Sequence, residues 1–311
     1  MPERGIVMDY SSLLACAGES GCTVTLDAPL AEYTSFRIGG AADVLVDIPD
    51  GEAAGKILAL CRREAIPTLW LGNGSNILVG DGGFRGAVLR WSADGEPTLL
   101  NEVTVYAPAG IPLKKLCMFA RDNGLTGLEF AFGIPGTVGG GVFMNAGAYG
   151  GELGQVIRSV DCLTPEGETV TYGVGDLGFG YRHTRLMDEG SIVAGATFVL
   201  TQGSAEVVEA RMKELLARRR EKQPLEYPSA GSFFKRPEGH FAGALIESAG
   251  LKGCRRGDAQ VSEKHAGFIV NLGHATAKDV TELCTYVQET VWERNGVRLE
   301  PEVRFVGEFT E

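Results

Sequence analysis

Apolar and polar residues alternate along the first third of the chain in a way that predicts a compact α/β lobe. Residues 42–48 alternate with the two-residue period of a half-buried strand, and residues 52–65 place apolar side chains at helical spacing. A second helix is expected over 112–123, with Gly124 as its stop. Further short strands are expected at 68–71, 87–91 and 102–107.

The pattern changes at residues 133–151, which read GIPGTVGGGVFMNAGAYGG. This segment is too rich in glycine for an ordinary helix and too apolar for a linker. Strand-like runs follow at 156–163, 168–172 and 191–200. We therefore expect a second lobe that is richer in strands than the first.

A long helix over residues 204–222 opens the last third of the chain. Ser204 can cap its start, Pro224 ends it, and its basic last turn suits the negative end of the helix dipole. We place a domain boundary near the start of this helix. The elements expected after it are a loop over 228–237, a helix over 242–248, a strand over 268–271, a helix from 279 to about 294 and a terminal strand over 298–306.

The charge balance argues against several classes of partner. Among 311 residues, 29 are Lys or Arg and 40 are Asp or Glu, which gives a formal net charge of −11. Apart from three arginines at 218–220, positive charge is not clustered, so neither a nucleic acid nor an anionic membrane is an expected partner. No apolar stretch is long enough to span a bilayer, and the first residues lack the apolar core of a signal peptide. We expect a cytoplasmic protein.

The spacing of cysteines and histidines indicates neither a disulfide framework nor a metal site. The 7 cysteines form no C-x-x-C pair. The 4 histidines follow no ligand spacing such as H-E-x-x-H. We therefore expect free thiols and no bound metal.

Glycine is the anomaly in the composition, because it provides 44 of the 311 residues, roughly twice its usual share. Residues 72–76 read Gly-Asn-Gly-Ser-Asn. They resemble the start of a dinucleotide fingerprint, but the third glycine is missing and no helix follows, so a Rossmann site is not expected. The backbone N–H groups of this loop suit a phosphate, and a plain tight turn explains the same residues equally well.

The 133–151 segment favours a cofactor over a plain turn. Its GIPGTVGG run and residues 145–147 offer backbone N–H groups without side chains in the way, so a pyrophosphate or a flat ring can lie against them. Close packing between domains also favours glycine and remains an alternative. Two such loops favour a large phosphorylated cofactor, whereas no Walker lysine supports hydrolysis of a nucleoside triphosphate.

Arg182, Ser232 and Glu302 stand out as single residues rather than as a motif. Ser232 follows a glycine, but the segment lacks the G-x-S-x-G elbow of a hydrolase nucleophile. Arg182 and Glu302 lie in or near expected strands, where an isolated charged residue is more often solvated or ion-paired than catalytic. Spacing in the sequence does not bring the three together.

Longer motifs give the chain a family resemblance. They are YTSFRIGG (33–40), LGNGSNILV (71–79), the segment 127–151, Tyr181-Arg182, AGSFFKRP (230–237), AGLKG (249–253) and LEPEVR (299–304). With these motifs the chain resembles the UDP-N-acetylmuramate dehydrogenase (UDP-N-acetylenolpyruvoylglucosamine reductase) family, and they occur in the family's order over nearly the whole chain. The length and the simple segment at 181–186 look like the shorter, type II form.

The resemblance implies an α+β fold with an FAD-binding module of the vanillyl-alcohol oxidase/p-cresol methylhydroxylase type. Two lobes form this module, and a C-terminal α/β domain binds the substrate. By this analogy the first FAD-binding lobe covers residues 1–92 and the second covers 93–203. The substrate-binding domain covers 204–297, and residues 298–311 return as a strand to the active site.

The resemblance also implies an activity. The family reduces UDP-N-acetyl-3-O-(1-carboxyvinyl)-glucosamine to UDP-N-acetylmuramate through bound FAD, with NADPH as the electron donor. The product is a peptidoglycan precursor, so the reaction serves cell-wall biogenesis, cell shape, cell division and the cell cycle. The expected partners are the enolpyruvyl sugar nucleotide and NADPH, and the sequence leaves the oligomeric state open.

The family pattern also assigns roles to single residues. Those expected to act on the substrate are Arg182, Ser232 and Glu302, and those expected to bind it are Tyr181, Lys222, Lys235 and Arg236. Those expected to hold FAD are Gly72, Asn73, Gly74, Ser75, Asn76, Gly133, Ile134, Pro135, Gly136, Thr137, Gly139, Gly140, Asn145, Ala146 and Gly147. Thr184, Leu186 and Arg236 depart from the family's usual Ser, Phe and Asn.

The three residue types expected in catalysis suit the implied chemistry. Hydride addition to the enolpyruvyl β-carbon develops negative charge at C2 and in the carboxylate. Arg182 and a protonated Glu302 can stabilise that charge, and Ser232 can donate a proton to C2.

Two other classes of function stay open. A flavoprotein acting on another alcohol or sugar does not need the AGSFFK and LEPEVR segments, and a non-catalytic flavin- or nucleotide-binding protein does not need the three residues together.

Overall fold

The structure is a computed structural model that describes residues 8–309. These residues fold into two compact units, and each is described by itself. Unit 1 comprises residues 8–26, 44–72 and 86–216, and unit 2 comprises residues 27–43, 73–85 and 217–309.

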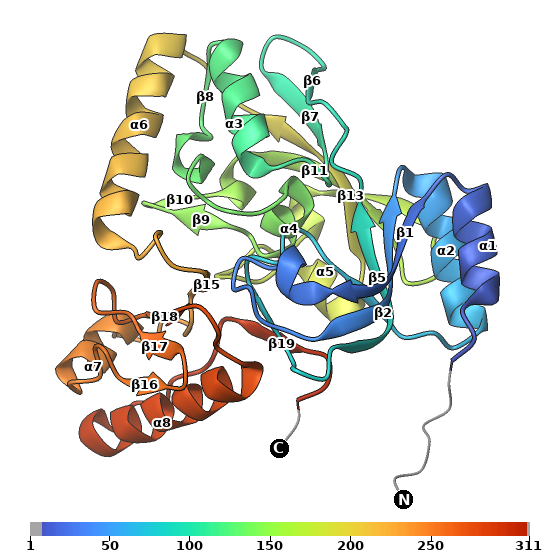
Figure 1. The fold of residues 1–311 in the computed structure, drawn as a ribbon. Helices are drawn as coiled ribbons and strands as arrows, with labels where there is room; N and C mark the ends of the chain where they lie inside the picture. The colour runs from blue at the N-terminus through green and yellow to red at the C-terminus, as the bar shows by residue number, and fades with distance from the viewer. Residues whose placement is uncertain (1–7, 310–311) are drawn as a thin grey trace, which may run out of the picture. The chain divides into compact units, whose positions relative to one another are not determined.

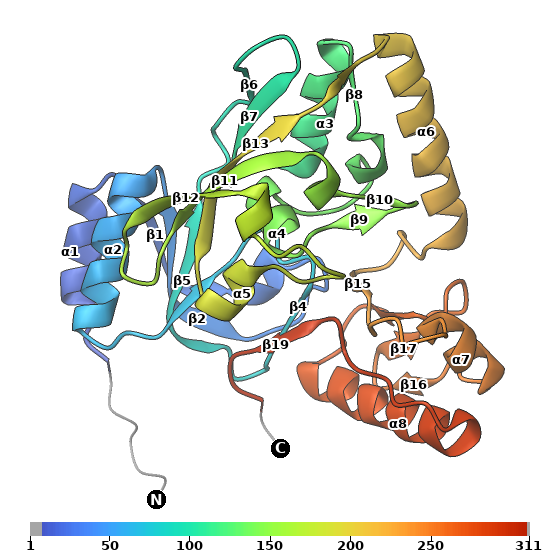
Figure 2. The same cartoon turned by 180° about the vertical axis from the view of Figure 1, so that it is seen from behind.

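One part of unit 1 is a sheet covered by two helices. Its elements are α1 (Ser11–Glu19), β1 (Thr23–Pro29), β2 (Ala41–Ile48), α2 (Gly51–Arg63), β3 (Thr68–Trp70) and β5 (Phe84–Trp91). The strand order is β1-β2-β5-β3, with β3 parallel to β5. Figures 1 and 2 show α1 and α2 side by side at this sheet. Fully buried side chains such as Val44, Ile57 and Leu89 form the core between the helices and the strands.

The strand expected at 42–48 and the helix expected at 52–65 are confirmed as β2 and α2. Asp50 starts α2, because its carboxylate accepts a hydrogen bond from the Ala53 N–H at 2.9 Å. The sequence pattern did not predict α1 and β1. Because α1 buries only Leu13 and Ala17, it lacks the long apolar stripe that marks a helix in a sequence.

The other part of unit 1 is built on an antiparallel five-stranded sheet. Its longer elements are β7 (Thr104–Pro108), α3 (Leu113–Asp122), α4 (Val138–Phe143), β11 (Ile157–Leu163), β12 (Thr169–Gly173), α5 (Arg185–Glu189), β13 (Ile192–Val199) and α6 (Ala205–Lys222). Its short elements are β6 (Thr98–Leu99), β8 (Leu125–Thr126), β9 (Gly147–Ala148), β10 (Gly151–Glu152), β14 (Thr201–Gln202) and the 3-10 turns Glu129–Ala131, Leu153–Gln155 and Val174–Asp176. The strand order is β12-β11-β13-β7-β6, and β11, β12 and β13 confirm the strands expected at 156–163, 168–172 and 191–200. Helix α6 continues into unit 2.

The glycine-rich segment contains a helix, so the expectation of no ordinary helix in 133–151 is wrong. The sequence VGGGVF forms α4. A Cβ on Gly139 would lie 2.8 Å from the Ala109 Cβ, and one on Gly141 would lie 2.9 Å from the Leu113 Cδ1. Glycine therefore lets α4 approach its neighbours closely, and this packing outweighs the low helix propensity of glycine.

Unit 2 combines a four-stranded sheet, two helices and a parallel pair of strands. Its elements are the 3-10 turn Leu30–Tyr33, β4 (Ile77–Val79), β15 (Ser229–Ser232), α7 (Ala242–Ser248), β16 (Arg255–Arg256), β17 (Ala259–Val261), β18 (Phe268–Asn271), α8 (Ala277–Asn295) and β19 (Arg304–Val306). The sheet has the order β15-β18-β17-β16, and β19 pairs in parallel with β4. Phe36 and Leu78, which are distant in sequence, join Ile246 and Leu283 in one buried core.

Local patterns predicted most of unit 2. The helix at 242–248 and the strand at 268–271 are confirmed with those bounds, and the helix expected from 279 is α8. The terminal strand is shorter than expected, because only residues 304–306 form β19 and the residues before it bond to the loop that follows β15. The short strands β16 and β17 were not predicted. The four-part division at residues 92, 203 and 297 stays a prediction.

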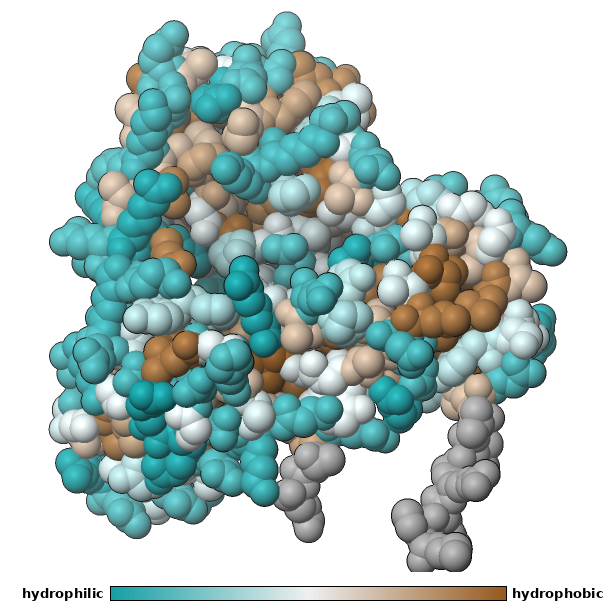
Figure 3. Space-filling view, viewed as in Figure 1, coloured by the Kyte–Doolittle hydropathy of each residue, from teal (hydrophilic) through white to brown (hydrophobic). Residues whose placement is uncertain are grey.

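Figure 3 shows one face of the molecule on which hydrophilic residues dominate and an apolar patch lies over β1 and α2. Among the residues that the structure describes, no helix is both long and apolar enough to cross a bilayer.

Because of His265, we expect the free energy of unfolding of unit 2 to decrease as the pH falls. Burial lowers the pKa of His265 below its ordinary value of 6.5, and the nearby Lys252 adds to this effect, while a main-chain hydrogen bond and Glu247 oppose it. Its Nδ1 accepts a hydrogen bond from the Gly267 N–H at 3.1 Å, which protonation at Nδ1 would remove. A lowered folded-state pKa stabilises the fold above pH 6.5, and this contribution is lost as the pH falls through the folded-state pKa.

We expect His265→Gln to make the free energy of unfolding less dependent on pH between about pH 7 and pH 5. Urea denaturation at both pH values measures this slope. The matched control is His240→Gln, because His240 is exposed and should leave the slope unchanged. Equal slopes for the wild type and His265→Gln would contradict the prediction.

Candidate functional site

The two glycine-rich loops approach each other within unit 1. Gly72 is exposed, and a Cβ on it would lie 2.8 Å from the Thr137 Oγ1. Thr137 caps α4, and its Oγ1 accepts a hydrogen bond from the Gly140 N–H at 3.2 Å. The start of the 72–76 loop therefore lies at the beginning of α4, and this close approach requires glycine at position 72.

The rest of the 72–76 loop packs against the YTSF motif in unit 2. Gly74 is buried with a φ of +56°, and a Cβ on it would overlap the Tyr33 carbonyl oxygen. The Ser35 N–H donates to the Gly74 carbonyl oxygen at 3.1 Å, and the Ser35 hydroxyl donates to the Ser229 carbonyl oxygen at 2.7 Å. Gly74 is thus required both by its left-handed backbone and by a close neighbour, which a plain tight turn does not need.

The residues before α4 present bare backbone, as the cradle of a dinucleotide requires. Of the hydrogen bonds within residues 8–309, none has the N–H of Gly133, Gly136 or Thr137 as its donor. Gly140 is exposed, and a Cβ on it would have only the Thr137 Oγ1 near it, at 3.5 Å. Unused N–H groups beside an exposed glycine fit a pyrophosphate, so the loop suits the FAD that the sequence predicts.

Several N–H groups of residues 133–147 are already engaged by the protein, among them that of Ile134, which donates to the Ala131 carbonyl oxygen at 2.9 Å. The Val138 N–H donates to the Ile111 carbonyl oxygen and the Gly139 N–H donates to the Ala109 carbonyl oxygen, both at 2.9 Å. Gly139 is therefore explained by the packing of α4. Its expected role in holding FAD, like the roles of Ile134, Pro135 and the half-buried Ser75, stays a prediction.

Segment 143–147, at the end of α4, carries a turn that contains Arg182. The Asn145 Nδ2 donates to the Gly180 carbonyl oxygen at 3.0 Å, and the Thr184 Oγ1 donates to the Phe143 carbonyl oxygen at 2.8 Å. The Arg182 Nη2 donates to the Gly147 carbonyl oxygen at 3.1 Å. Asn145 is buried, so its side chain supports the turn rather than facing solvent.

Tyr181 and Arg182 are the two central residues of this turn. Gly180 and His183 exchange two main-chain hydrogen bonds, of 3.0 and 3.3 Å, across it. Arg182 has a φ of +54°, a conformation that is uncommon for a residue other than glycine. Tyr181 is 55% exposed, and its ring centre lies 5.2 Å from the Arg182 guanidinium carbon. The turn thus projects an aromatic ring and a cation together.

Ser232 and Glu302 are brought together in unit 2 although 70 positions separate their numbers. The Glu302 N–H donates to the carbonyl oxygen of Phe233, the residue after Ser232, at 2.8 Å. The Asn76 Nδ2 donates to the Glu302 carbonyl oxygen at 3.2 Å. Ser232 ends β15 and is exposed, and its hydroxyl takes part in no hydrogen bond described for the chain between residues 8 and 309. The backbone of Glu302 therefore lies between the residue that follows Ser232 and Asn76 of the 72–76 loop.

The cations expected to bind substrate all lie in unit 2, and all are exposed. Lys222 is the last residue of α6. The Lys235 Nζ lies 3.3 Å from the Glu300 Oε2. The Arg236 guanidinium lies 4.5 Å from the ring centre of Phe241. Arg236 therefore stacks on an aromatic ring where the family more often has Asn.

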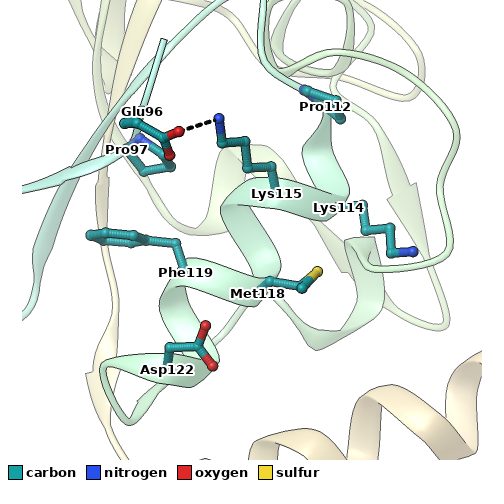
Figure 4. Close-up of a pocket in the computed structure, with 8 residues that line it drawn as sticks. All are labelled: Glu96, Pro97, Pro112, Lys114, Lys115, Met118, Phe119 and Asp122. Atoms are coloured by element: carbon teal, nitrogen blue, oxygen red, sulfur yellow. Dashed lines mark hydrogen bonds and ion pairs between the residues drawn. The ribbon is translucent and has the colours of Figure 1, made fainter. Parts of the chain in front are cut away.

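A pocket in unit 1 lies away from these residues. It measures about 360 Å³, lies on α3, and contains none of the residues expected to act on substrate or cofactor. Figure 4 shows the Lys115–Glu96 ion pair, 2.6 Å long, at its rim. In the described part of the chain, no group of three His, Cys, Asp or Glu side chains could hold a metal ion.

The comparisons with known proteins address the family directly. The family model described as UDP-N-acetylenolpyruvoylglucosamine reductase, C-terminal domain, matches residues 223–306. The model described as FAD binding domain matches residues 42–173. A UDP-N-acetylenolpyruvoylglucosamine reductase of Levilactobacillus brevis is 49% identical over 282 residues, which cover 91% of this chain and 92% of that protein. The chain belongs to the UDP-N-acetylenolpyruvoylglucosamine reductase family.

Further relatives agree with this assignment. A UDP-N-acetylenolpyruvoylglucosamine reductase of Streptococcus pyogenes serotype M18 is 48% identical over 288 residues, covering 93% of this chain and 97% of that protein. The crystal structure of UDP-N-acetylenolpyruvylglucosamine reductase from Thermus caldophilus superimposes with a TM-score of 0.78 at 38% identity. That match covers 91% of this chain and 98% of the other.

Membership in the UDP-N-acetylenolpyruvoylglucosamine reductase family confirms the predicted family, the predicted fold class and FAD as the predicted cofactor. The structure also explains two departures from the family pattern. Thr184 keeps a hydroxyl that bonds to Phe143, and Leu186 is fully buried in the core of unit 1. Nothing in the sequence indicates the side-chain hydrogen bonds of Asn145 and Asn76, since one sequence does not show which distant carbonyl oxygen an amide reaches.

Gly74 provides a test of the cofactor loop. We expect Gly74→Ala to weaken FAD binding by roughly tenfold or more, because alanine at this φ is strained and its Cβ overlaps Tyr33. Fluorescence titration of the apoprotein with FAD measures the dissociation constant. The control is Gly21→Ala, since Gly21 has a φ of +69° and nothing within 4 Å of its Cβ position. Unchanged FAD affinity in Gly74→Ala would contradict the assignment of this loop.

Proposed function

We propose that the chain uses the residues placed above to reduce UDP-N-acetyl-3-O-(1-carboxyvinyl)-glucosamine to UDP-N-acetylmuramate, with NADPH as the electron donor. Family membership supplies the reaction. The observation that supports the assignment of residues is the main-chain hydrogen bond from Glu302 to Phe233, because it joins the segment of Glu302 to the residue that follows the exposed Ser232.

The bare backbone of the glycine loops supports FAD binding. When bound, FAD accepts hydride from NADPH and supplies it to the enolpyruvyl β-carbon. In unit 1 the residues that would hold it are Gly72, Gly133, Gly136, Thr137 and Gly140, and the family resemblance adds Ile134, Pro135, Gly139, Ala146 and Gly147. In unit 2 they are Asn73, Gly74, Ser75 and Asn76. The backbone N–H groups of Gly133, Gly136 and Thr137, which have no acceptor within the described residues, can donate to the pyrophosphate without a lysine.

Ser232 supplies the proton that completes the reduction. As the C2–H bond forms, the Ser232 O–H bond breaks, and the exposed oxygen regains a proton from solvent. A hydroxyl is a weak acid, but a carbanion at C2 is a strong base, so the transfer is downhill. The absence of a hydrogen-bond acceptor for this hydroxyl in the described part of the chain leaves its proton available to the substrate.

Arg182 and Glu302 stabilise the charge that develops on the substrate carboxylate. Arg182 carries a permanent positive charge and can pair with both carboxylate oxygens. Glu302 acts in its protonated form, as a hydrogen-bond donor, because an ionised carboxylate would repel the developing charge. Each of the two groups strengthens its interaction as the charge grows, so both lower the barrier more than they lower the energy of the bound substrate.

The exposed cations of unit 2 suit the diphosphate of the substrate. Lys222, Lys235 and Arg236 are exposed at positions where an anionic ligand can reach them, and Tyr181 offers an aromatic face in unit 1. Ion pairs of this kind contribute affinity and orientation rather than chemistry.

We place the reaction in the cytoplasm, where NADPH and sugar nucleotides are available. The solubility expected of an acidic chain agrees with this location.

Anaerobic stopped-flow absorbance of the flavin band tests the proposal. NADPH should bleach the band, and the enolpyruvyl sugar nucleotide should then restore it rapidly. Recovery with UDP-N-acetylglucosamine alone, which lacks the enolpyruvyl group, should not occur. Bleaching without recovery would favour a flavoprotein that acts on another alcohol or sugar, and a bound flavin that NADPH never reduces would favour a non-catalytic binding protein.

A further inference from the structure

A buried asparagine links the glycine-rich segment to the turn that carries Arg182. Asn145 is 1% exposed and has a φ of +41°, in the left-handed region that asparagine tolerates better than most residues. Its Nδ2 donates to the Gly180 carbonyl oxygen at 3.0 Å, and its Oδ1 accepts from the Gly154 N–H at 2.9 Å. Both ends of the amide are therefore used, so the side chain has one orientation.

The turn needs such support because its backbone is strained. Arg182 adopts a φ of +54°, which a residue with a Cβ keeps only when its surroundings enforce it. The turn begins at Gly180, whose carbonyl oxygen Asn145 holds. Just beyond its other end, the buried Thr184 donates its hydroxyl to the Phe143 carbonyl oxygen at 2.8 Å. Both ends of the turn are thus attached to segment 143–147.

The same segment also directs the Arg182 side chain. The Arg182 Nη2 donates to the Gly147 carbonyl oxygen at 3.1 Å. Gly147 is itself held in β9, opposite Glu152 of β10, and a Cβ on it would lie 2.9 Å from the Glu152 Cβ. The backbone and the guanidinium of Arg182 are therefore both held by hydrogen bonds to one short stretch of chain, segment 143–147.

We propose that Asn145 is a positioning residue, which holds the Gly180–His183 turn so that Arg182 meets the substrate carboxylate in the right orientation. This inference rests on the proposed role of Arg182. It assigns the Asn145 side chain to the turn and not to the cofactor. Replacing Asn145 should therefore slow recovery of the flavin band by the substrate and leave bleaching by NADPH unaffected.

Asn145→Asp is the sharpest substitution, because it keeps an oxygen for the Gly154 N–H and replaces the donor to Gly180 with a second oxygen. We expect the recovery of the flavin band by the enolpyruvyl sugar to slow by roughly 10- to 100-fold, as for a misplaced catalytic group. Bleaching by NADPH and the affinity for FAD should stay within about twofold of wild type. The control is Asn123→Asp, since the Asn123 amide also donates to a backbone carbonyl in unit 1, that of Phe119 at 2.8 Å, but lies outside the turn.

A double-mutant cycle shows whether Asn145 acts through Arg182. If it does, Asn145→Asp should add almost nothing to the effect of Arg182→Ala on recovery of the band. Additive effects, or an equal loss in bleaching and recovery, would overturn the inference while the role of Arg182 stood. If Arg182→Ala leaves recovery unchanged, the proposed role of Arg182 fails instead. The two failures are therefore distinguishable.

Hydrogen exchange of the holoenzyme gives a readout that does not depend on turnover. In Asn145→Asp, amides of the 180–184 segment should exchange faster, whereas Asn123→Asp should leave them unchanged. If Asn145→Asp does not fold, Thr184→Val removes the other attachment of the turn without changing side-chain size, and recovery of the band should slow in the same direction. Unchanged exchange in segment 180–184, or unchanged recovery in Thr184→Val, would count against the inference.

Discussion

Replacing Ser232 with alanine is expected to slow the recovery of the flavin band by the enolpyruvyl sugar roughly 10²- to 10⁴-fold, while its bleaching by NADPH stays unchanged. The exposed Ser232 hydroxyl is the group proposed to protonate C2, and it has no acceptor that competes for its proton in the described part of the chain. Alanine removes that proton and little else, because position 232 ends β15 and its backbone pairing with Phe268 remains. Anaerobic stopped-flow absorbance measures the two steps separately.

Ser248→Ala is the matched control for Ser232→Ala. Ser248 lies in unit 2 at the end of α7, and its hydroxyl donates to the Leu245 carbonyl oxygen at 2.9 Å. Both steps should keep their wild-type rates in this variant. If Ser232→Ala slows bleaching and recovery equally, Ser232 is a structural residue and the proton must come from elsewhere.

Glu302→Ala is expected to slow recovery of the band roughly 10²- to 10³-fold, as the loss of one donor to a developing negative charge does. Glu302→Gln should be less damaging, because the amide of glutamine can still donate a hydrogen bond to the substrate carboxylate. The backbone bonds of residue 302, to Phe233 and from Asn76, do not depend on the side chain, so both variants should fold.

The comparison between the two Glu302 variants separates two roles for this residue. A group that only donates a hydrogen bond is partly replaced by glutamine, whereas a group that must give up its proton is not. Equal loss in Glu302→Gln and Glu302→Ala would contradict the proposed stabilising role. Glu289→Ala, on the exposed side of α8, is the control and should leave both steps unchanged.

Elements with a strong local pattern were predictable from the sequence. The apolar spacing in α2, α7 and β18 is a property of neighbouring residues, so it predicts a helix or a strand wherever the segment packs. The pattern failed for α1, which buries little, and for α4, whose glycines allow close packing against Ala109, Leu113 and Leu153. In both cases the decisive contacts are with residues far away along the chain.

The candidate site was predictable only through the family motifs. Spacing alone left Arg182, Ser232 and Glu302 as unrelated residues. In the structure a main-chain hydrogen bond joins Glu302 to Phe233, the residue after Ser232. Hydrogen bonds also attach Arg182 and its turn to segment 143–147. None of these contacts can be predicted from the local sequence, because a main-chain carbonyl oxygen can accept a hydrogen bond at any residue type.

The sequence by itself determined the family, the reaction chemistry and most of the helices and strands, because motifs and hydrophobic periodicity depend only on residues that are close together in the chain. Only the tertiary structure decided which loops meet. Gly72 approaches Thr137, Gly74 lies against Tyr33, and the Asn145 amide reaches Gly180. The physical reason is that the partner of a loop is chosen by the packing of all elements into a shared core, and the free energy of that packing belongs to the whole fold rather than to any one segment.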